Sequence, residues 1–118
     1  MKGRIVLIIC LVLAGSCKKD TAPPGILTKS QMADWMIKVY LAEARASAWS
    51  IPRDSAYKLF VPYQDTLKRR NGLADSTLMK SYLYYLENSK DMEAIYDIVI
   101  DSLNLREQRV LKTAPDNQ

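Results

Sequence analysis

The sequence predicts an all-α fold, a small antiparallel bundle of three or four helices. Apolar residues recur at helical spacing in four segments, and no segment alternates for long between apolar and polar residues. The connections between these segments are only a few residues long, which favours antiparallel packing of neighbouring helices. The chain has 118 residues, 48% of them hydrophobic, enough for one domain with one core.

The first 16 residues are excluded from this core because they have the pattern of a targeting segment. Lys2 and Arg4 form a positive n-region, and residues 5–13 form an apolar run that includes Cys10. A spanning helix needs roughly 20 apolar residues, about twice the length of this run. We therefore expect residues 1–16 to be a signal peptide that is cleaved from the mature protein.

Small residues connect the apolar run to Cys17, in the order Leu13-Ala14-Gly15-Ser16-Cys17. This pattern resembles the lipobox cut by the lipoprotein signal peptidase, although Leu is commoner than Ala at the place of Ala14. We expect cleavage between Ser16 and Cys17 and lipidation of the Cys17 thiol, with about two or three acyl chains for stable attachment to a membrane. The alternative is an ordinary secretory signal followed by a chance cysteine.

Residues 17–26 are expected to be the lipidated cysteine and a flexible tether. Pro23, Pro24 and Gly25 disfavour a helix here, and the segment reaches at most about 30 Å. Without the signal peptide the chain keeps 15 basic against 13 acidic residues, a balance of +2 that is too small to indicate nucleic-acid binding. Cys10 leaves with the signal peptide, so the mature domain has no thiol for a disulfide.

The helical domain is predicted to span residues 27–112, and its first helix residues 29–48. Thr28 and Gln31 form a capping box, Leu27 and Met32 fit a hydrophobic staple, and Pro52 follows the helix. The predicted buried stripe of this helix consists of Met32, Trp35, Met36, Val39, Ala42, Ala46 and Trp49.

A second helix is expected to begin with Asp54 or Ser55 as its N-cap and to end at Asn71 and Gly72. Pro62 lies inside it, so we expect a kink, or two short helices of which Pro62 opens the second. The residues expected to face inward are Ala56, Phe60, Tyr63 and Leu67.

Two further helices complete the prediction. The third spans residues 75–87 and is followed by the breakers Asn88 and Ser89, and the fourth starts near Lys90. Their predicted apolar residues are Leu78, Met79, Tyr82, Tyr85 and Leu86 in the third and Met92, Ile95, Tyr96, Val99, Leu103 and Val110 in the fourth. Residues 113–118 are expected to form a disordered tail.

Three groups of residues resemble a known family. They are Leu41-Ala42-Glu43-Ala44, Ser81-Tyr82-Leu83-Tyr84-Tyr85-Leu86, and residues 92–99 around Ile95-Tyr96-Asp97. Over residues 26–103 the chain resembles small lipoproteins of the Bacteroidota that contain domain of unknown function 4296. The resemblance implies a helical lipoprotein without known activity, and none of these residues forms a catalytic motif. Lys90 departs from the Pro-Glu-like turn expected there, which blurs that helix boundary.

The composition argues against an enzyme. The chain has no histidine, and Cys17, the only mature cysteine, is expected to be acylated, which leaves carboxylates, lysines and tyrosines for acid–base work. No carboxylate cluster has the spacing of a metal site. We therefore predict no catalytic residue, no metal and no cofactor.

Two residues are candidate contacts for a partner. Glu43 lies among small neighbours and is expected to be half-buried, where it needs an ion pair unless it lies at a solvated edge. Tyr84 is the least core-facing, by spacing, of an aromatic set that is otherwise expected in the core and consists of Trp35, Trp49, Tyr82, Tyr84, Tyr85 and Tyr96. Lys68, Arg69 and Arg70 are interpreted as a solvated helix end.

An Asp-Ser or Asp-Thr pair occurs five times and resembles the Asp-Ser/Thr-apolar sequon for O-glycosylation of exported proteins in Bacteroidota. The candidate acceptors are Thr21, Ser55, Thr66, Ser76 and Ser102. Ordinary N-cap chemistry explains the pairs at Ser55 and Ser76 without a glycan. The exposed tether makes Thr21 the strongest candidate.

The leading hypothesis for function is a membrane-anchored interaction or scaffolding module that binds a protein of the cell envelope. The alternative is a ligand-binding or enzymatic periplasmic lipoprotein, which an enclosed apolar pocket with converging polar groups would favour. Lys18 and Lys19 are followed by the single acid Asp20 rather than by an acidic run. This favours a periplasm-facing domain, on the outer rather than the inner membrane.

Overall fold

The structure is a computed structural model that describes residues 20–113. These residues form four helices and no strand, namely α2 (Lys29–Ala48), α3 (Arg53–Arg70), α4 (Asp75–Glu87) and α5 (Ser89–Thr113). The prediction of a small all-α bundle is confirmed. Within the described range, no helix combines the length and the apolar character needed to cross a membrane. The predicted signal peptide, Cys17 and residues 114–118 of the predicted tail lie outside this range.

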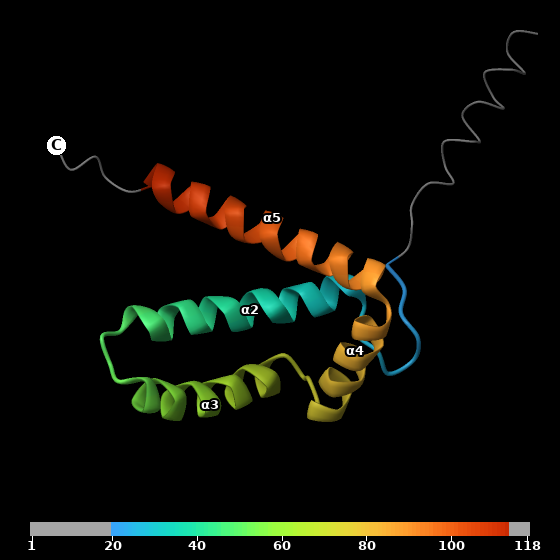
Figure 1. Ribbon diagram of the computed structural model, residues 1–118, viewed down its shortest axis with the longest axis horizontal. Coiled ribbons are helices and arrows are strands. Elements are labelled where there is room, and N and C mark those ends of the chain that lie inside the picture. Colours follow the sequence, from blue (N-terminus) through green and yellow to red (C-terminus); the bar gives the residue numbers. More distant parts are fainter. Residues whose placement is uncertain (1–19, 114–118) are drawn as a thin grey trace, which may run out of the picture.

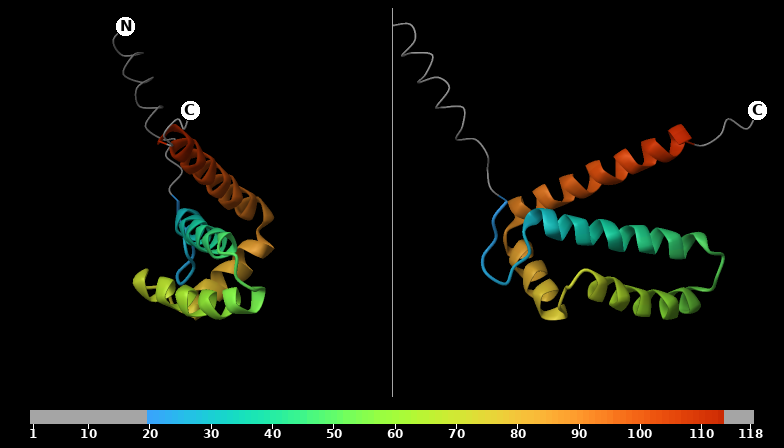
Figure 2. Two further views of the ribbon diagram at one scale, coloured as in Figure 1. Left: turned by 90° about the vertical axis from the view of Figure 1, so that its left-hand side faces the viewer. Right: turned by 180° about the vertical axis from the view of Figure 1, so that it is seen from behind.

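The helices form a bundle with two different ends. α2 lies between α3 and α5, and α4 crosses the end at which α2 and α5 begin (Figures 1 and 2). α3 runs antiparallel to α2, whereas α5 runs in the same direction as α2 and diverges from it toward its C-terminus. We call the end crossed by α4 the closed end, and the end at which α2 turns into α3 and α5 terminates the open end.

Local chemistry sets the start of α2 as predicted. The Gln31 amide N–H donates to Thr28 Oγ1 at 3.2 Å, and the Thr28 N–H donates to Gln31 Oε1 at 2.9 Å. Leu27 and Met32, on either side of this capping box, are both buried. The box satisfies two N–H groups that the first helical turn leaves without partners, so the helix starts at a defined residue.

The core lies at the closed end of the bundle. Its buried residues are Leu27, Met32, Ala33, Trp35, Met36, Ile37, Leu78, Tyr85, Ile95 and Val99. Ala33 and Ile37 were not on the predicted stripe. They are buried because α2 lies between other elements and therefore has more than one covered face.

The N-terminus of α3 differs from the prediction. Its N-cap is Pro52, without a side-chain hydrogen bond, so neither Asp54 nor Ser55 caps it. The helix runs unbroken through Pro62, which contradicts two short helices. Lys58 and Pro62 are exposed, so water can satisfy the carbonyl that loses its hydrogen bond to the proline. The predicted C-terminus is confirmed, with Asn71 as C-cap and Gly72 at φ 63°.

Several residues expected to face the core are exposed instead. They are Trp49, Tyr63, Met79, Leu86, Tyr96 and Val110. Helical spacing identifies the apolar side of a helix, but a residue is buried only where another element covers that side. Since α5 diverges from α2 and α3 contributes no buried residue, the apolar sides of these helices remain partly uncovered toward the open end. Met79 and Leu86 lie instead on α4, so part of the apolar side of that helix is also uncovered.

Candidate functional site

The segment before α2 folds back onto the bundle. The Asp20 carboxylate accepts hydrogen bonds from the backbone N–H of Lys29 at 3.1 Å and of Ser30 at 2.9 Å. A turn follows, in which the Ile26 N–H donates to the Pro23 carbonyl at 3.1 Å and Gly25 has a φ of 77°. Positive φ is readily accessible only to glycine. The proline and glycine residues that disfavour a helix in this segment therefore favour the turn. We call residues 20–27 the N-terminal strap.

Two buried side chains of α4 hold the other end of the strap. The Leu27 N–H donates to Ser81 Oγ at 2.9 Å, and the Tyr85 hydroxyl donates to the Leu27 carbonyl at 2.7 Å. The Ser81 hydroxyl donates in turn to the Thr77 carbonyl at 2.7 Å. Both backbone groups of Leu27 are thus satisfied inside the core, where an unpaired polar group is costly.

Two of the side chains that make the strap contacts have shifted pKa values. Hydrogen bonds from the Ser30 hydroxyl, and from the N–H groups of Ser30 and Lys29, hold the pKa of Asp20 below its ordinary value. Burial raises the pKa of Tyr85. At neutral pH Asp20 is therefore an ionised acceptor and Tyr85 a protonated donor, as their hydrogen bonds require.

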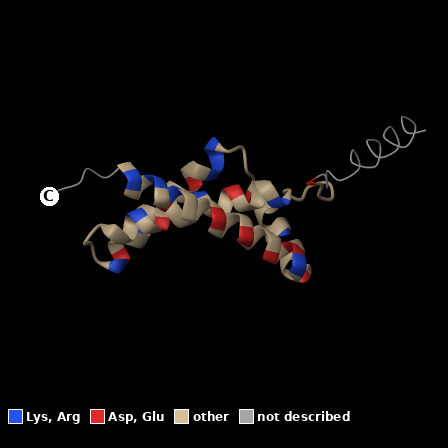
Figure 3. Ribbon diagram, turned by 90° about the horizontal axis from the view of Figure 1, so that it is seen from above, with Lys and Arg blue, Asp and Glu red and all other residues tan. Residues whose placement is uncertain are grey.

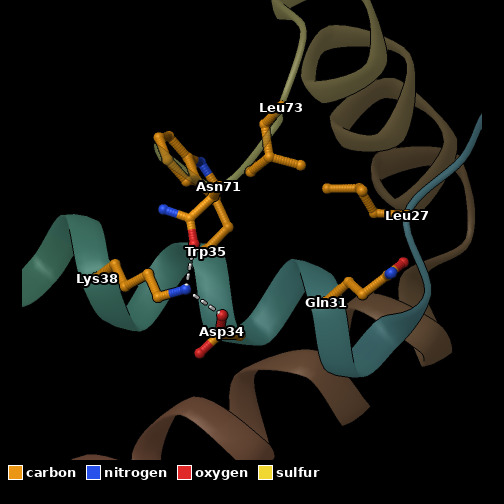
Figure 4. A pocket seen from close by; sticks show the side chains of 7 residues that line it. All are labelled: Leu27, Gln31, Asp34, Trp35, Lys38, Asn71 and Leu73. Carbon is orange, nitrogen blue, oxygen red and sulfur yellow. Dashed lines mark hydrogen bonds and ion pairs between the residues drawn. The ribbon is translucent and has the colours of Figure 1, made fainter. Parts of the chain in front are cut away.

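A small pocket lies between α2 and the end of α3 (Figure 4). Lys38 Nζ donates to Asp34 Oδ2 and to Asn71 Oδ1, each at 2.5 Å, and Asn71 Nδ2 donates to the Leu67 carbonyl at 2.7 Å. The pocket holds about 120 Å³, below the roughly 300 Å³ at which ligand pockets begin. Asp34, Lys38 and Asn71 already bond to one another, so this cluster joins α2 to α3 rather than forming a ligand site.

A larger groove lies between α2 and α3 toward the open end. It holds about 370 Å³ and is lined by Ala42, Arg45, Ala46, Trp49, Leu59, Phe60 and Tyr63. The small side chains of Ala42 and Ala46 leave space that the aromatic residues do not fill. Trp49 remains 60% exposed and Tyr63 45% exposed, so the groove is open to solvent. We call it the α2–α3 groove; Arg45 is its only charged lining residue.

The two predicted partner contacts have different surroundings. Glu43 is exposed, which contradicts the expected half-burial, and among the described residues it forms no ion pair. It follows the buried Ala42 and therefore points to another side of α2, which is a solvated edge. Tyr84 is half-buried and contacts Tyr85 edge-to-face, with ring centroids 5.1 Å apart. Tyr96 is more exposed than Tyr84, which contradicts the expected order.

Glu43 lies near Tyr40 of its own helix and Tyr82 of α4. Burial raises the pKa of Tyr40 and of Tyr82, and the Glu43 carboxylate and the neighbouring Tyr96 raise both further. These hydroxyls therefore stay protonated at neutral pH and can donate hydrogen bonds, but they are poor bases.

The predicted O-glycosylation acceptors differ in accessibility. Thr21, Ser55 and Ser76 are exposed, whereas Thr66 and Ser102 are half-buried. Thr66 Oγ1 donates to the Pro62 carbonyl at 3.0 Å. The N-caps of α3 and α4 are Pro52 and Ala74, so N-capping by Asp54-Ser55 or Asp75-Ser76, the alternative explanation of those pairs, is wrong.

Charged residues gather at the junction of α3 and α4. Lys68, Arg69 and Arg70 occupy the last turn of α3, as predicted. Lys68 Nζ lies 2.8 Å from Asp65 Oδ1 and 2.6 Å from Asp75 Oδ1, so it joins the two helices. Within residues 20–113, no three carboxylate, thiol or imidazole groups lie close enough to hold a metal ion.

Sequence reasoning missed both the strap contacts and the α2–α3 groove. The Asp20–Ser30 contact spans ten residues and the Leu27–Ser81 contact spans 54, beyond any local spacing rule. The lining residue Leu59 was not expected to face α2. The signal in the sequence that could have found it is the apolar pair Leu59-Phe60, which places two neighbouring sides of the helix in apolar surroundings.

Comparison with known proteins identifies the family but no activity. A family model described as a domain of unknown function (DUF4296) matches residues 23–109. No curated protein and no solved structure matches the chain. The matched range includes α2, α3, α4 and nearly all of α5, as well as every residue of the α2–α3 groove. Because the match covers well over half of the sequence, the chain belongs to the DUF4296 family.

Proposed function

We propose that this protein is a lipid-anchored interaction module of the cell envelope. The observation that carries the proposal is the position of Cys17, directly after a short apolar run and the small residues Ala14, Gly15 and Ser16. A run of this length is too short to span a bilayer, whereas acyl chains on a terminal cysteine anchor a domain stably.

Metabolic labelling with palmitate tests the anchor. We expect the full-length chain to incorporate label and the Cys17→Ser variant to lose it, because no other side chain forms the thioether. Cys10→Ser is the matched control, since Cys10 leaves with the signal peptide, and should keep the label. Label retained in Cys17→Ser, or absent from the unaltered chain, contradicts lipidation at Cys17.

For the interaction itself we propose the α2–α3 groove. Its lining is apolar apart from Arg45, and Trp49, Leu59 and Tyr63 remain exposed although they are large and apolar. Binding energy in protein interfaces concentrates where apolar anchors of one partner fill such a depression in the other. A protein of the envelope that inserts one or two apolar side chains fits this surface.

Site-specific photocrosslinking in the native envelope tests this surface. A photoreactive residue at Leu59 should give one discrete protein adduct, whereas the same residue at Leu105 should give none. Leu105 is the matched control because it is similarly exposed but lies on α5, outside the groove. The same adduct from both positions, or none from Leu59, contradicts the groove as the contact. A copurifying small amphiphile that Leu59→Glu displaces would instead support the ligand-binding alternative.

We further propose that the domain faces the periplasm from the outer membrane. The support is the pair Lys18 and Lys19 after Cys17, in place of an acidic run. Protease added to intact cells should leave the protein uncut, and the same protease should cut it after the outer membrane is permeabilised. Cleavage in intact cells contradicts this placement.

A further inference from the structure

We infer that the closed end of the bundle rests at the membrane surface and that the α2–α3 groove is held away from it. This inference rests on the proposed lipidation of Cys17 and adds an orientation to it. The partner of the closed end is a lipid surface, and the N-terminal strap determines which part of the bundle meets it.

The strap shortens the free tether. Asp20 is already fixed through its hydrogen bonds to Lys29 and Ser30, so only Lys18 and Lys19 separate the fixed chain from Cys17. Three residue steps reach about 10 Å. With residues 17–26 all free, the same anchor would leave the bundle roughly 30 Å of reach.

Asp20 lies at the closed end. The strap begins beside the first turns of α2 and α5 (Figure 1), where Lys29 Nζ lies 3.1 Å from Asp91 Oδ1. A helix of the length of α2 extends about 30 Å. The α2–α3 groove begins at Ala42 and therefore lies roughly 20 to 30 Å farther along the bundle than the point of attachment.

Charge disfavours a bundle that lies flat on α5. Glu93, Asp97 and Asp101 follow one another at intervals of four residues and are all exposed. They lie on the side of α5 opposite the buried Ile95 and Val99, and so on its outer face. Figure 3 shows the charged residues from this side of the bundle. Anionic headgroups repel such a face. The closed end carries charges of both signs, with the exposed Lys90 and the paired Lys29 beside the exposed Glu87, so it lacks a continuous acidic row.

Energy transfer from tryptophan to a dansyl lipid measures the orientation. Trp35 lies toward the closed end and Trp49 at the open end, roughly 20 Å apart along α2. The chain from Cys17 onward is coupled through that thiol to a maleimide lipid in phosphatidylethanolamine–phosphatidylglycerol vesicles. Chemical coupling makes the result independent of lipidation in the cell, so a failed palmitate labelling and a failed orientation are separate outcomes.

We expect Trp49→Phe to raise the mean transfer efficiency, by up to roughly two-fold, because it removes the donor that is farther from the bilayer. In the Trp49→Phe background, Asp20→Ala should lower the transfer, since it frees the strap as far as Leu27. Ten Gly/Ser residues inserted between Lys19 and Asp20 should lower it as well, without altering any core residue. Asp54→Ala, another exposed aspartate near a helix start, is the control and should leave it unchanged.

Transfer that Trp49→Phe leaves unchanged or lowers overturns the orientation, because the bundle then lies flat or turns freely. Transfer that is the same with the native and the lengthened tether overturns the role of the short tether. Circular dichroism of each variant excludes unfolding as the cause of a lowered signal, and the insertion keeps the test valid should Asp20→Ala unfold.

Discussion

The closed and open ends of the bundle consist of the same helices, but their apolar residues are covered to different degrees. At the closed end the strap, α4 and α5 enclose the first half of α2, and Tyr85 and Ile95 are almost completely buried. At the open end Trp49 and Val110 are exposed, and α3 has no buried residue at all. We therefore expect the closed end to supply most of the stability, because the buried core lies there.

The same contrast separates the contacts of the strap from the surface for which we propose a partner. Every contact of the strap lies at the closed end, whereas the α2–α3 groove, whose lining is apolar apart from Arg45, lies toward the open end. If the proposed lipid anchor holds the N-terminus, this division keeps the proposed binding surface away from the point of attachment. Substitutions at matched positions of the two ends measure how complete the division is.

The largest effect is expected from truncation of the core. Ile95→Ala should lower the free energy of unfolding by about 3 kcal/mol, because it removes a fully buried side chain and leaves a cavity. Leu111→Ala, on the same helix but 69% exposed, should change it by less than about 0.5 kcal/mol. Chemical denaturation followed by circular dichroism measures both. Equal losses would show that the open end is as well packed as the closed end.

The next effect concerns the hydrogen bonds that hold the strap. Tyr85→Phe should lower the free energy of unfolding by about 1 to 2 kcal/mol, because the buried carbonyl of Leu27 loses its hydrogen-bond donor. The control Tyr57→Phe alters an exposed tyrosine on α3 and should be neutral in the same denaturation experiment. If Tyr85→Phe is neutral as well, water replaces the hydroxyl and the strap is not held from α4 in this way.

A smaller effect tests the two helix starts against each other. Thr28→Ala should lower the free energy of unfolding by about 1 kcal/mol. The Thr28 hydroxyl caps α2 by accepting a hydrogen bond from a backbone N–H, and alanine leaves that N–H without this partner. Ser55→Ala should have almost no effect, since the N-cap of α3 is Pro52 and no side chain caps that helix. Urea unfolding of both variants measures the effect as the difference between their unfolding midpoints. A cost for Ser55→Ala equal to that of Thr28→Ala would mean that α3 starts at Ser55 in solution.

The sequence was sufficient for what local chemistry decides. The bounds of α2 and α4 agree with the prediction because the capping box at Thr28, the break after Glu87 and the apolar spacing act within a few residues. Asn71 and Gly72 end α3 for the same reason. In contrast, the predicted N-cap of α3 was wrong. Asp or Ser caps a helix only where the helix begins at that residue, and α3 begins earlier, after Pro52.

The arrangement of the helices and of the strap in space could not be predicted from the sequence. Trp49 is exposed although it lines the α2–α3 groove, and no spacing within α2 predicts how much of this side chain α3 covers. The α2–α3 groove likewise requires Phe60 to lie opposite Ala42 and Ala46, which depends on how the two helices pack. The contact of Asp20 with the start of α2 depends on the turn at Gly25, and the composition of this segment equally suits a free tether.

The smallest expected effect is the release of Asp20 in acid. Hydrogen bonds hold its folded-state pKa below the ordinary value, so its contribution to stability is complete above the unfolded-state pKa and is lost as the pH falls through the folded-state pKa. The strap should therefore be unaffected between about pH 7 and pH 5 and weaken only below the ordinary aspartate pKa of about 3.9. The amide proton shift of Ser30, followed by NMR during acid titration, reports this step because that N–H donates to Asp20. The step should vanish in Asp20→Asn, and its persistence there would assign it to another carboxyl and leave the strap without an ionic contact at α2.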